Sequence, residues 1–98
     1  MTEAPEFEWD DDKRRENIRK HGVDFLRVAL IFKGPVVQFE DDRLAYGEER
    51  TVSLSLALGT VYRVVSTVRE NRIRIISAQK ANRHEQEIYY RSIFDEGH

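Results

Sequence analysis

Three consecutive segments of alternating side chains, joined by very short turns, constrain the fold of this chain most. Residues 50–58, 61–69 and 72–78 alternate with the two-residue period of a β-strand. In the first segment the larger apolar side chains fall on one face: Val52, Leu54, Leu56 and Leu58. Gly59-Thr60 and Glu70-Asn71 are two-residue turns of the kind that join neighbouring antiparallel strands. The sequence therefore predicts an antiparallel meander of three long strands.

Helical signals come before the meander. Asp10 or Asp11 fits the N-cap of a very polar helix that runs to about His21, and Gly22 fits the residue that ends it. Asp24 fits the N-cap of a second helix. Its apolar side chains recur at helical spacing, at Phe25, Val28, Ala29 and Phe32. A Gly-Pro pair then ends this helix.

A third helix and two short strands complete the predicted fold. Asn82 and Glu85 are spaced as a capping box, so we expect a helix from there to about residue 92 or 93. Residues 6–9 and 36–39 are typical of short strands, and residues 40–49 of a charged loop. The expected order is β-α-α-β-β-β-β-α, an α+β fold whose helices cover one face of the sheet.

Length and composition limit the class of protein. Ninety-eight residues suit one domain, so we expect residues 1–98 to form one, with frayed ends at 1–5 and 95–98. The absence of cysteine excludes disulfides and thiolate sites. No apolar run approaches the roughly 20 residues of a membrane span, and the acidic N-terminus differs from a signal or transit peptide. We therefore expect a soluble cytoplasmic protein that does not bind membranes.

The net charge of −2 hides an uneven distribution of charge. Residues 1–12 hold six acidic and no basic side chains, whereas residues 69–84 hold five basic side chains and one acidic one. A local basic face matters more to a polyanion than the net charge does. The simpler alternative is that these arginines form the solvated face of a strand. The acidic N-terminus would also suit a segment that folds back over the basic strand.

Several kinds of site lack their sequence signals. His21 and His84 lie far apart and outside any metal-binding spacing, so no metal or cofactor is predicted. None of the five glycines forms a phosphate-binding loop pattern. A Ser–His–acid triad stays open, but the serines at 53, 55, 66 and 77 fall within predicted strands rather than on a nucleophile elbow.

The remaining polar residues suit cleavage of RNA without a metal. That reaction needs a proton acceptor, cations for the charge on phosphorus, and a proton donor for the leaving oxygen. His21 follows a basic helix, and histidine titrates near neutral pH. Arg72 and Arg74 share one strand face, and Arg83 begins the last helix. Trp9 and Tyr89 offer rings on which bases can stack.

Each of these residues also has a purely structural interpretation. His21 before Gly22 would only cap helix carbonyls. Arg72 and Arg74 would pair with nearby acids, with Glu49, Glu70 and Glu85 as the candidates. Trp9 would be part of the core.

Motifs spread over most of the chain resemble the BrnT family, the toxin half of the BrnT/BrnA type II toxin–antitoxin systems. They are FEWD at 7–10, Lys13, Asn17, KHGVDF at 20–25, GEER at 47–50, RIRIISA at 72–78 and NRHE with a following tyrosine at 82–89. The resemblance implies a RelE-like fold and a ribonuclease that arrests growth. It also implies a BrnA-like ribbon-helix-helix antitoxin, through which alone the toxin meets operator DNA.

The resemblance also implies a set of site residues, carried over by position: Trp9, Lys13, His21, Glu49, Arg50, Arg72, Arg74, Arg83 and Tyr89. It suggests that His21 or Glu49 transfers the proton and that Arg72 and Arg74 hold the scissile phosphate. Lys13, Arg50 and Arg83 would then position the RNA backbone. Gln79 departs from the basic residue expected there, and the Lys-Gly pair at 33–34 departs from the usual acids.

Two other functions remain open for such a chain. One is a ParE-like inhibitor that binds gyrase and cleaves no RNA. The other is a degenerate toxin that acts only as an antitoxin-binding module. The titratable side chain of His21 favours the ribonuclease, because a protein that only binds has no need of a group that exchanges protons.

Overall fold

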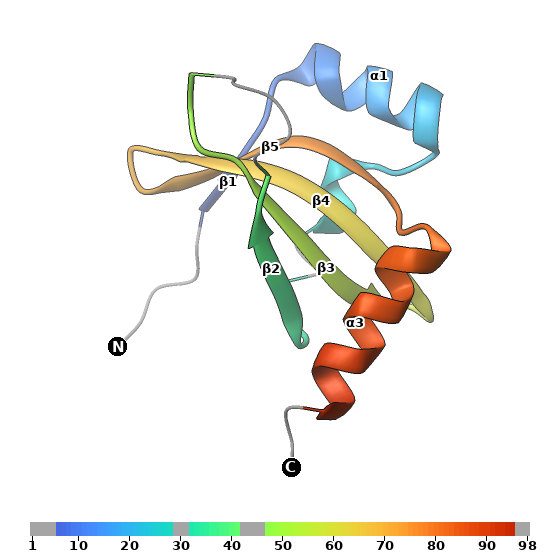
Figure 1. Ribbon diagram of the computed structural model, residues 1–98. Helices are drawn as coiled ribbons and strands as arrows, with labels where there is room; N and C mark the ends of the chain where they lie inside the picture. The colour runs from blue at the N-terminus through green and yellow to red at the C-terminus, as the bar shows by residue number, and fades with distance from the viewer. Residues whose placement is uncertain (1–5, 29–31, 42–46, 96–98) are drawn as a thin grey trace.

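The computed structural model describes residues 6–28, 32–41 and 47–95, and these form an α+β fold around one twisted sheet (Figure 1). The strands are β1 (Glu6–Glu8), β2 (Val36–Glu40), β3 (Thr51–Ala57), β4 (Thr60–Arg69) and β5 (Arg72–Lys80). The helices are α1 (Asp11–His21), the short 3-10 helix η1 (Phe25–Arg27) and α3 (Arg83–Asp95). Among the described residues no helix is long and apolar enough to span a membrane.

The predicted meander is confirmed and gains a strand at each edge. The order across the sheet is β1-β5-β4-β3-β2. Strands β3, β4 and β5 are antiparallel neighbours, and β2 pairs with β3 in the same sense. Strand β1 pairs in parallel with β5, so residues 6–8 lie beside residues 72–74. The first strand of the chain therefore lies against the last.

Both tight turns use backbone conformations with positive φ. Glu70 and Asn71 have φ of 50° and 66°, so the predicted second turn is confirmed. The first turn consists of Leu58 and Gly59, with φ of 52° and 81°, because Thr60 already pairs with Ala57. The prediction of Gly59-Thr60 was thus wrong by one residue. Turns with two such residues match the right-handed twist of the strands they connect.

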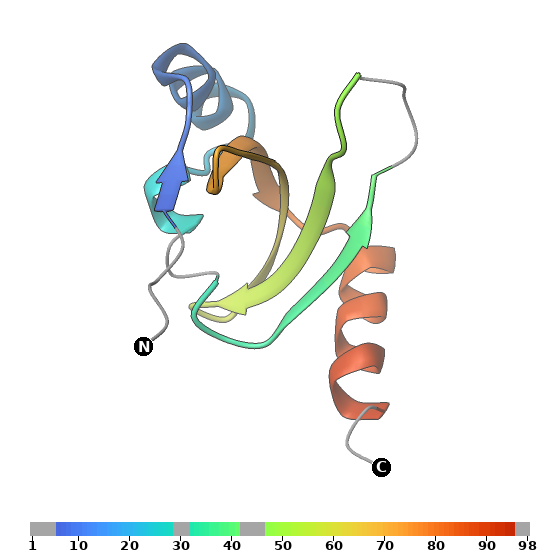
Figure 2. The ribbon, with the colours of Figure 1, turned by 90° about the vertical axis from the view of Figure 1, so that its left-hand side faces the viewer.

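Helices cover both faces of the sheet, so the expectation that they cover one face was wrong. Figure 2 shows α1 and η1 on one side of the sheet and α3 on the other. A first core cluster beneath η1 includes Phe25, Val64 and Ile75, and a second cluster beneath α3 includes Leu54 and Tyr89. The face of β3 that was expected to be polar carries small residues such as Ser53 and Ser55, both fully buried.

Helix α1 has the predicted limits, and hydrogen bonds rather than an apolar stripe attach it to the sheet. Asp10 accepts from the backbone N–H of Asp12 at 2.8 Å, and Gly22 ends the helix with φ of 69°. The buried Asn17 side chain donates to the carbonyls of Ala78 and Val23, at 2.7 and 2.8 Å, and accepts from the Ala78 N–H at 3.1 Å. Asn17 thus pairs with the edge of β5 as a strand would.

The predicted second helix is only partly described. Its first turn is η1, a 3-10 helix rather than an α-helix, capped by Asp24 through the Leu26 N–H at 3.0 Å. The Phe32 N–H donates to the carbonyl of Val28, four residues earlier, as in an α-helical turn. Residues 29–31 lie outside the described residues. Phe25 and Val28 are fully buried, as their spacing predicts.

Asp24 links η1 to α1 through a bidentate ion pair. Both nitrogens of the Arg14 fork lie 2.8 Å from its carboxylate oxygens. Together with the Leu26 N–H, Arg14 lowers the pKa of Asp24 from 3.8 to about 2. The pair therefore stabilises the fold above the ordinary pKa of an aspartate, and this contribution is lost as the pH falls through about 2.

We expect Asp24→Asn to lower the free energy of unfolding at pH 7 by about 1 kcal/mol, because asparagine still caps the helix but carries no charge. The deficit should shrink between pH 4 and pH 2 as the wild-type carboxylate becomes protonated. Urea unfolding of the two proteins at pH 7, pH 4 and pH 2 measures this difference in the free energy of unfolding. A deficit that stays constant over this range would show that the ion pair contributes nothing.

Helix α3 begins with the predicted capping box and ends later than expected. The Asn82 side chain accepts from the Glu85 N–H at 2.8 Å, and the Glu85 carboxylate accepts from the Asn82 N–H at 2.9 Å. The same carboxylate lies 2.7 Å from Arg63 of β4, in an ion pair whose side chains are only 10% and 14% exposed. The helix continues to Asp95, which was expected to fray.

Candidate functional site

Two arginines and two glutamates face each other along the first strand pair of the sheet. The parallel register places Glu6 opposite Arg72 and Glu8 opposite Arg74, and each pair of side chains meets at 3.1 Å. The structural interpretation, that Arg72 and Arg74 pair with acidic side chains, is therefore confirmed. The partners are Glu6 and Glu8 rather than the three glutamates that were expected. The acidic N-terminus does fold back over the basic strand, through Glu6 and Glu8.

The β4–β5 hairpin adds a third arginine to the same face. Its two-residue turn puts Arg69 directly opposite Arg72, and Thr67 opposite Arg74. Directly paired residues of antiparallel strands project from the same face. Arg69 was missed in the sequence, although a two-residue turn at 70–71 already fixes this register.

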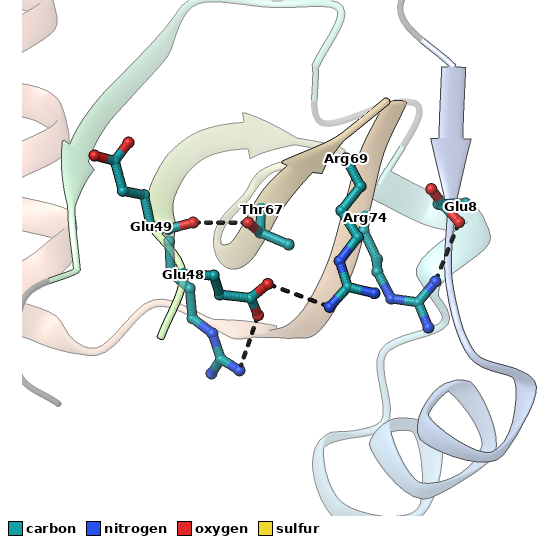
Figure 3. Close-up of polar contacts among 7 residues, drawn as sticks. Glu8, Glu48, Glu49, Thr67, Arg69 and Arg74 are labelled. Atoms are coloured by element: carbon teal, nitrogen blue, oxygen red, sulfur yellow. Dashed lines mark hydrogen bonds and ion pairs between the residues drawn. The ribbon is translucent and has the colours of Figure 1, made fainter. Parts of the chain in front are cut away.

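Glu48 and Arg50 complete this surface at the start of β3. The Glu48 carboxylate lies 3.2 Å from Arg69 and 3.5 Å from Arg50, and Figure 3 shows it beside the Arg74–Glu8 pair. The hydrogen bond with Arg69 lowers the pKa of Glu48, which keeps the carboxylate charged. Thr67 donates its hydroxyl to the Glu49 carbonyl at 2.7 Å, which ties this segment to β4. We call the surface formed by Arg50, Arg69, Arg72 and Arg74 the arginine face.

An open cleft of about 450 Å³ adjoins the arginine face. It is lined by Glu48, Glu49, Thr51, Thr67, Val68 and Arg69. In Figure 3 the Glu49 carboxylate points away from Arg69 and Arg74. Glu49 is exposed, and no ion pair holds its carboxylate within the part of the chain that the structure describes. It is thus available as a proton acceptor at the edge of this cleft.

Lys13 and His21 lie together in a second hollow of about 230 Å³, between α1 and β5. They share it with Glu16, Asn17, Lys20, Ile76 and Ser77. Ile76 is the extra residue of a β-bulge, because Ser77 pairs with Val65 and Ile75 with Ser66. Residues 13, 16, 17, 20 and 21 follow the helical spacing of one face, which is a signal that the sequence carries.

The second hollow and the arginine face lie along the same strand. Ser77 and Arg74 pair with Val65 and Thr67, which are two residues apart and so point to the same face of the sheet. At the rise of a β-strand, Ser77 lies roughly 7–10 Å from Arg74. The structure therefore brings Lys13 and His21 into the neighbourhood of the arginines.

Three predicted site residues do not join this group. Tyr89 is 3% exposed and donates its hydroxyl to the Pro35 carbonyl at 3.2 Å, so its ring belongs to the core and presents no surface for stacking. Trp9 is half-buried on the opposite side of the sheet and packs edge-to-face on Phe25. Arg83 follows the far end of β5, roughly 20 Å from Arg74 by strand rise, with its side chain 95% exposed.

Within residues 6–28, 32–41 and 47–95, no three histidine or acidic side chains gather into a group that would hold a metal ion. The carboxylates of the arginine face instead pair with guanidinium groups.

Comparison with known proteins shows what the chain as a whole is similar to. Residues 9–85 match the family model described as the ribonuclease toxin BrnT of type II toxin–antitoxin systems. The 1.1 Å crystal structure of the Brucella abortus ribonuclease toxin BrnT superposes on the chain with a TM-score of 0.60 at 21% identity. The match covers 82% of this chain and all of the Brucella chain. Among the curated proteins, none matches the sequence of this chain.

Proposed function

Since the chain belongs to the BrnT family of ribonuclease toxins from type II toxin–antitoxin systems, we propose that it cleaves RNA at the arginine face without a metal ion. The observation that carries this proposal is the convergence of four guanidinium groups on one face, with Glu49 and His21 on either side of it. Guanidinium groups suit phosphate because their planar forks grip two oxygens at once.

The proposed reaction is attack of a ribose 2′-oxygen on its own phosphorus. The new O2′–P bond forms as the P–O5′ bond breaks, which leaves a cyclic phosphate and a free 5′-hydroxyl. Glu49 or His21 removes the 2′ proton, and a protonated side chain returns one to the leaving oxygen. Arg72 and Arg74 stabilise the charge that develops on phosphorus.

The remaining predicted residues divide by position. Arg50, at the β3 end of the arginine face, and Lys13, in the neighbouring hollow, would position the RNA backbone. Arg83 would contact the RNA only if the bound strand extended to the far end of β5. Neither Trp9 nor Tyr89 keeps the stacking role first assigned to it, because Trp9 packs on the opposite side of the sheet and Tyr89 lies in the core.

The proposed partner is a BrnA-like ribbon-helix-helix antitoxin. An acidic segment of such a partner would cover the arginine face and exclude RNA, because complementary charge favours that contact. Operator DNA is then bound through the antitoxin in the complex. The active toxin would act on cytoplasmic RNA and so arrest growth.

Incubation of the purified protein with total RNA in EDTA tests this function, with and without its antitoxin. We expect fragments that carry 5′-hydroxyl ends and that disappear when the antitoxin is added. Cleavage that EDTA abolishes would contradict the metal-free reaction. Intact RNA from folded protein, together with inhibited supercoiling by gyrase, would favour a ParE-like inhibitor instead.

A further inference from the structure

In the free protein, carboxylates already occupy the guanidinium groups of the arginine face. Glu8 lies against Arg74, and Glu48 lies between Arg69 and Arg50. The Glu8–Arg74 contact joins β1 to β5, and the Glu48–Arg69 contact joins the segment before β3 to β4 (Figure 3). A carboxylate and a phosphate present the same kind of oxygens to a guanidinium fork.

The two carboxylates lie where an RNA strand can compete with them. The Glu8 and Glu48 side chains are 31% and 27% exposed, and those of Arg74 and Arg69 are 26% and 55% exposed. Contacts that are partly open to water are weak and exchange readily with other anions. By contrast, the Arg63–Glu85 pair between β4 and α3 is far more buried, with side chains 10% and 14% exposed.

Arg69 and Arg74 are close enough to act on one strand of RNA. Arg69 pairs with Arg72, and Arg74 is two residues further along β5, so Arg69 and Arg74 are diagonal neighbours. Diagonal neighbours on antiparallel strands lie roughly 7–8 Å apart, within reach of long side chains. The two guanidinium groups can therefore bind neighbouring phosphates.

We propose that Arg69 is a further phosphate-binding residue and that Glu8 and Glu48 occupy the two phosphate positions until RNA displaces them. The proposal rests on the proposed function, since it takes RNA as the ligand. It gives the two glutamates a defined effect on binding: each competes with one phosphate and so lowers the affinity of the face for RNA. If they served only to orient the arginines, their loss would weaken binding instead.

The test measures the affinity for an RNA oligonucleotide with 2′-O-methyl groups, which this reaction cannot cleave, by fluorescence anisotropy at several salt concentrations. We expect Glu8→Gln and Glu48→Gln each to bind about 3- to 10-fold more tightly than wild type. Arg69→Ala should bind about 10-fold more weakly and reduce the slope of log K against log salt by about 1.

Matched controls separate these contacts from a general change of charge. Asp12→Asn and Arg15→Ala make the same charge changes at an exposed ion pair on α1, and we expect affinities within about 2-fold of wild type. Circular dichroism confirms that each variant is folded. The two glutamate variants probe separate ion pairs, so each tests the proposal by itself.

Unchanged or weaker binding by either glutamate variant, or unchanged binding by Arg69→Ala, would overturn the proposal. The proposed function fails in a different way, through folded wild-type protein that leaves unmodified RNA intact. Cleavage of RNA with no change of affinity in the three variants would overturn this inference alone. Absence of any RNA binding by wild type would overturn both.

Discussion

Replacement of Arg74 by alanine should lower the rate of RNA cleavage by about 100-fold or more without loss of the fold. Its side chain is 26% exposed, against 55% for Arg69 and for Arg72, so it is the most sheltered of the three arginines that the β4–β5 hairpin contributes to the arginine face. A preorganised donor that meets charge only in the transition state is worth roughly 10²- to 10³-fold in rate. Single-turnover cleavage of a defined RNA measures this loss.

Two further variants show which property of Arg74 matters. Arg74→Lys keeps the charge but loses the planar fork, so we expect it to recover only part of the rate. Arg15→Ala removes an exposed arginine of α1 that pairs with Asp12, and it should cleave at the wild-type rate. If Arg74→Ala cleaved RNA at full rate, the reaction would take place elsewhere on the protein.

Replacement of Asn17 by alanine should destabilise the protein by about 3 kcal/mol or more. Its side-chain amide makes three hydrogen bonds in a buried setting, to both backbone groups of Ala78 and to the carbonyl of Val23. Each buried polar group left without a partner costs about 1–3 kcal/mol. That is a large fraction of the roughly 5–15 kcal/mol that stabilises a small domain. Urea unfolding at pH 7 measures the loss.

The Asn17 prediction has a control on the same helix. Arg19 is exposed and pairs with Glu16 along the surface of α1, so Arg19→Ala should change the free energy of unfolding by less than about 0.5 kcal/mol. Asn17→Asp keeps the acceptor but loses both donors, and should be as destabilising as alanine. A loss below 1 kcal/mol in Asn17→Ala would mean that water replaces the amide at no cost.

Local signals predicted the elements of this fold more reliably than their layers. The caps at Asp10, Gly22 and Asn82 act through neighbours within four residues, so the sequence carries them in full. The alternation of β3 carries less information, because Ser53 and Ser55 are small and fully buried on the face of the sheet that holds the first core cluster. The alternating side chains of β3 then lie on two buried faces, rather than on one buried and one solvent-exposed face.

The site was less predictable because its contacts join distant parts of the chain. Arg50, Arg72 and Arg74 were identified in the sequence, whereas Arg69 was missed although the turn at 70–71 fixes its place opposite Arg72. The partners of Arg72 and Arg74 depend on a three-residue strand whose pairing no local signal specifies. Tyr89 belongs to the sequence motif of the last helix, but the motif gives no sign that its ring is buried. The packing of α3 against the sheet places the ring in the core.

The pairing of β1 with β5 also orders events during synthesis of the protein. Glu6 and Arg72 are 66 residues apart, so β1 leaves the ribosome well before β5 and can pair with it only after β5 has been synthesised. A nascent chain that stops before residue 72 has neither Arg72 nor Arg74 and no neighbour for β1. Translation that stops before residue 72 therefore yields fragments without the arginine face, and only a chain that includes residues 72–74 can assemble it.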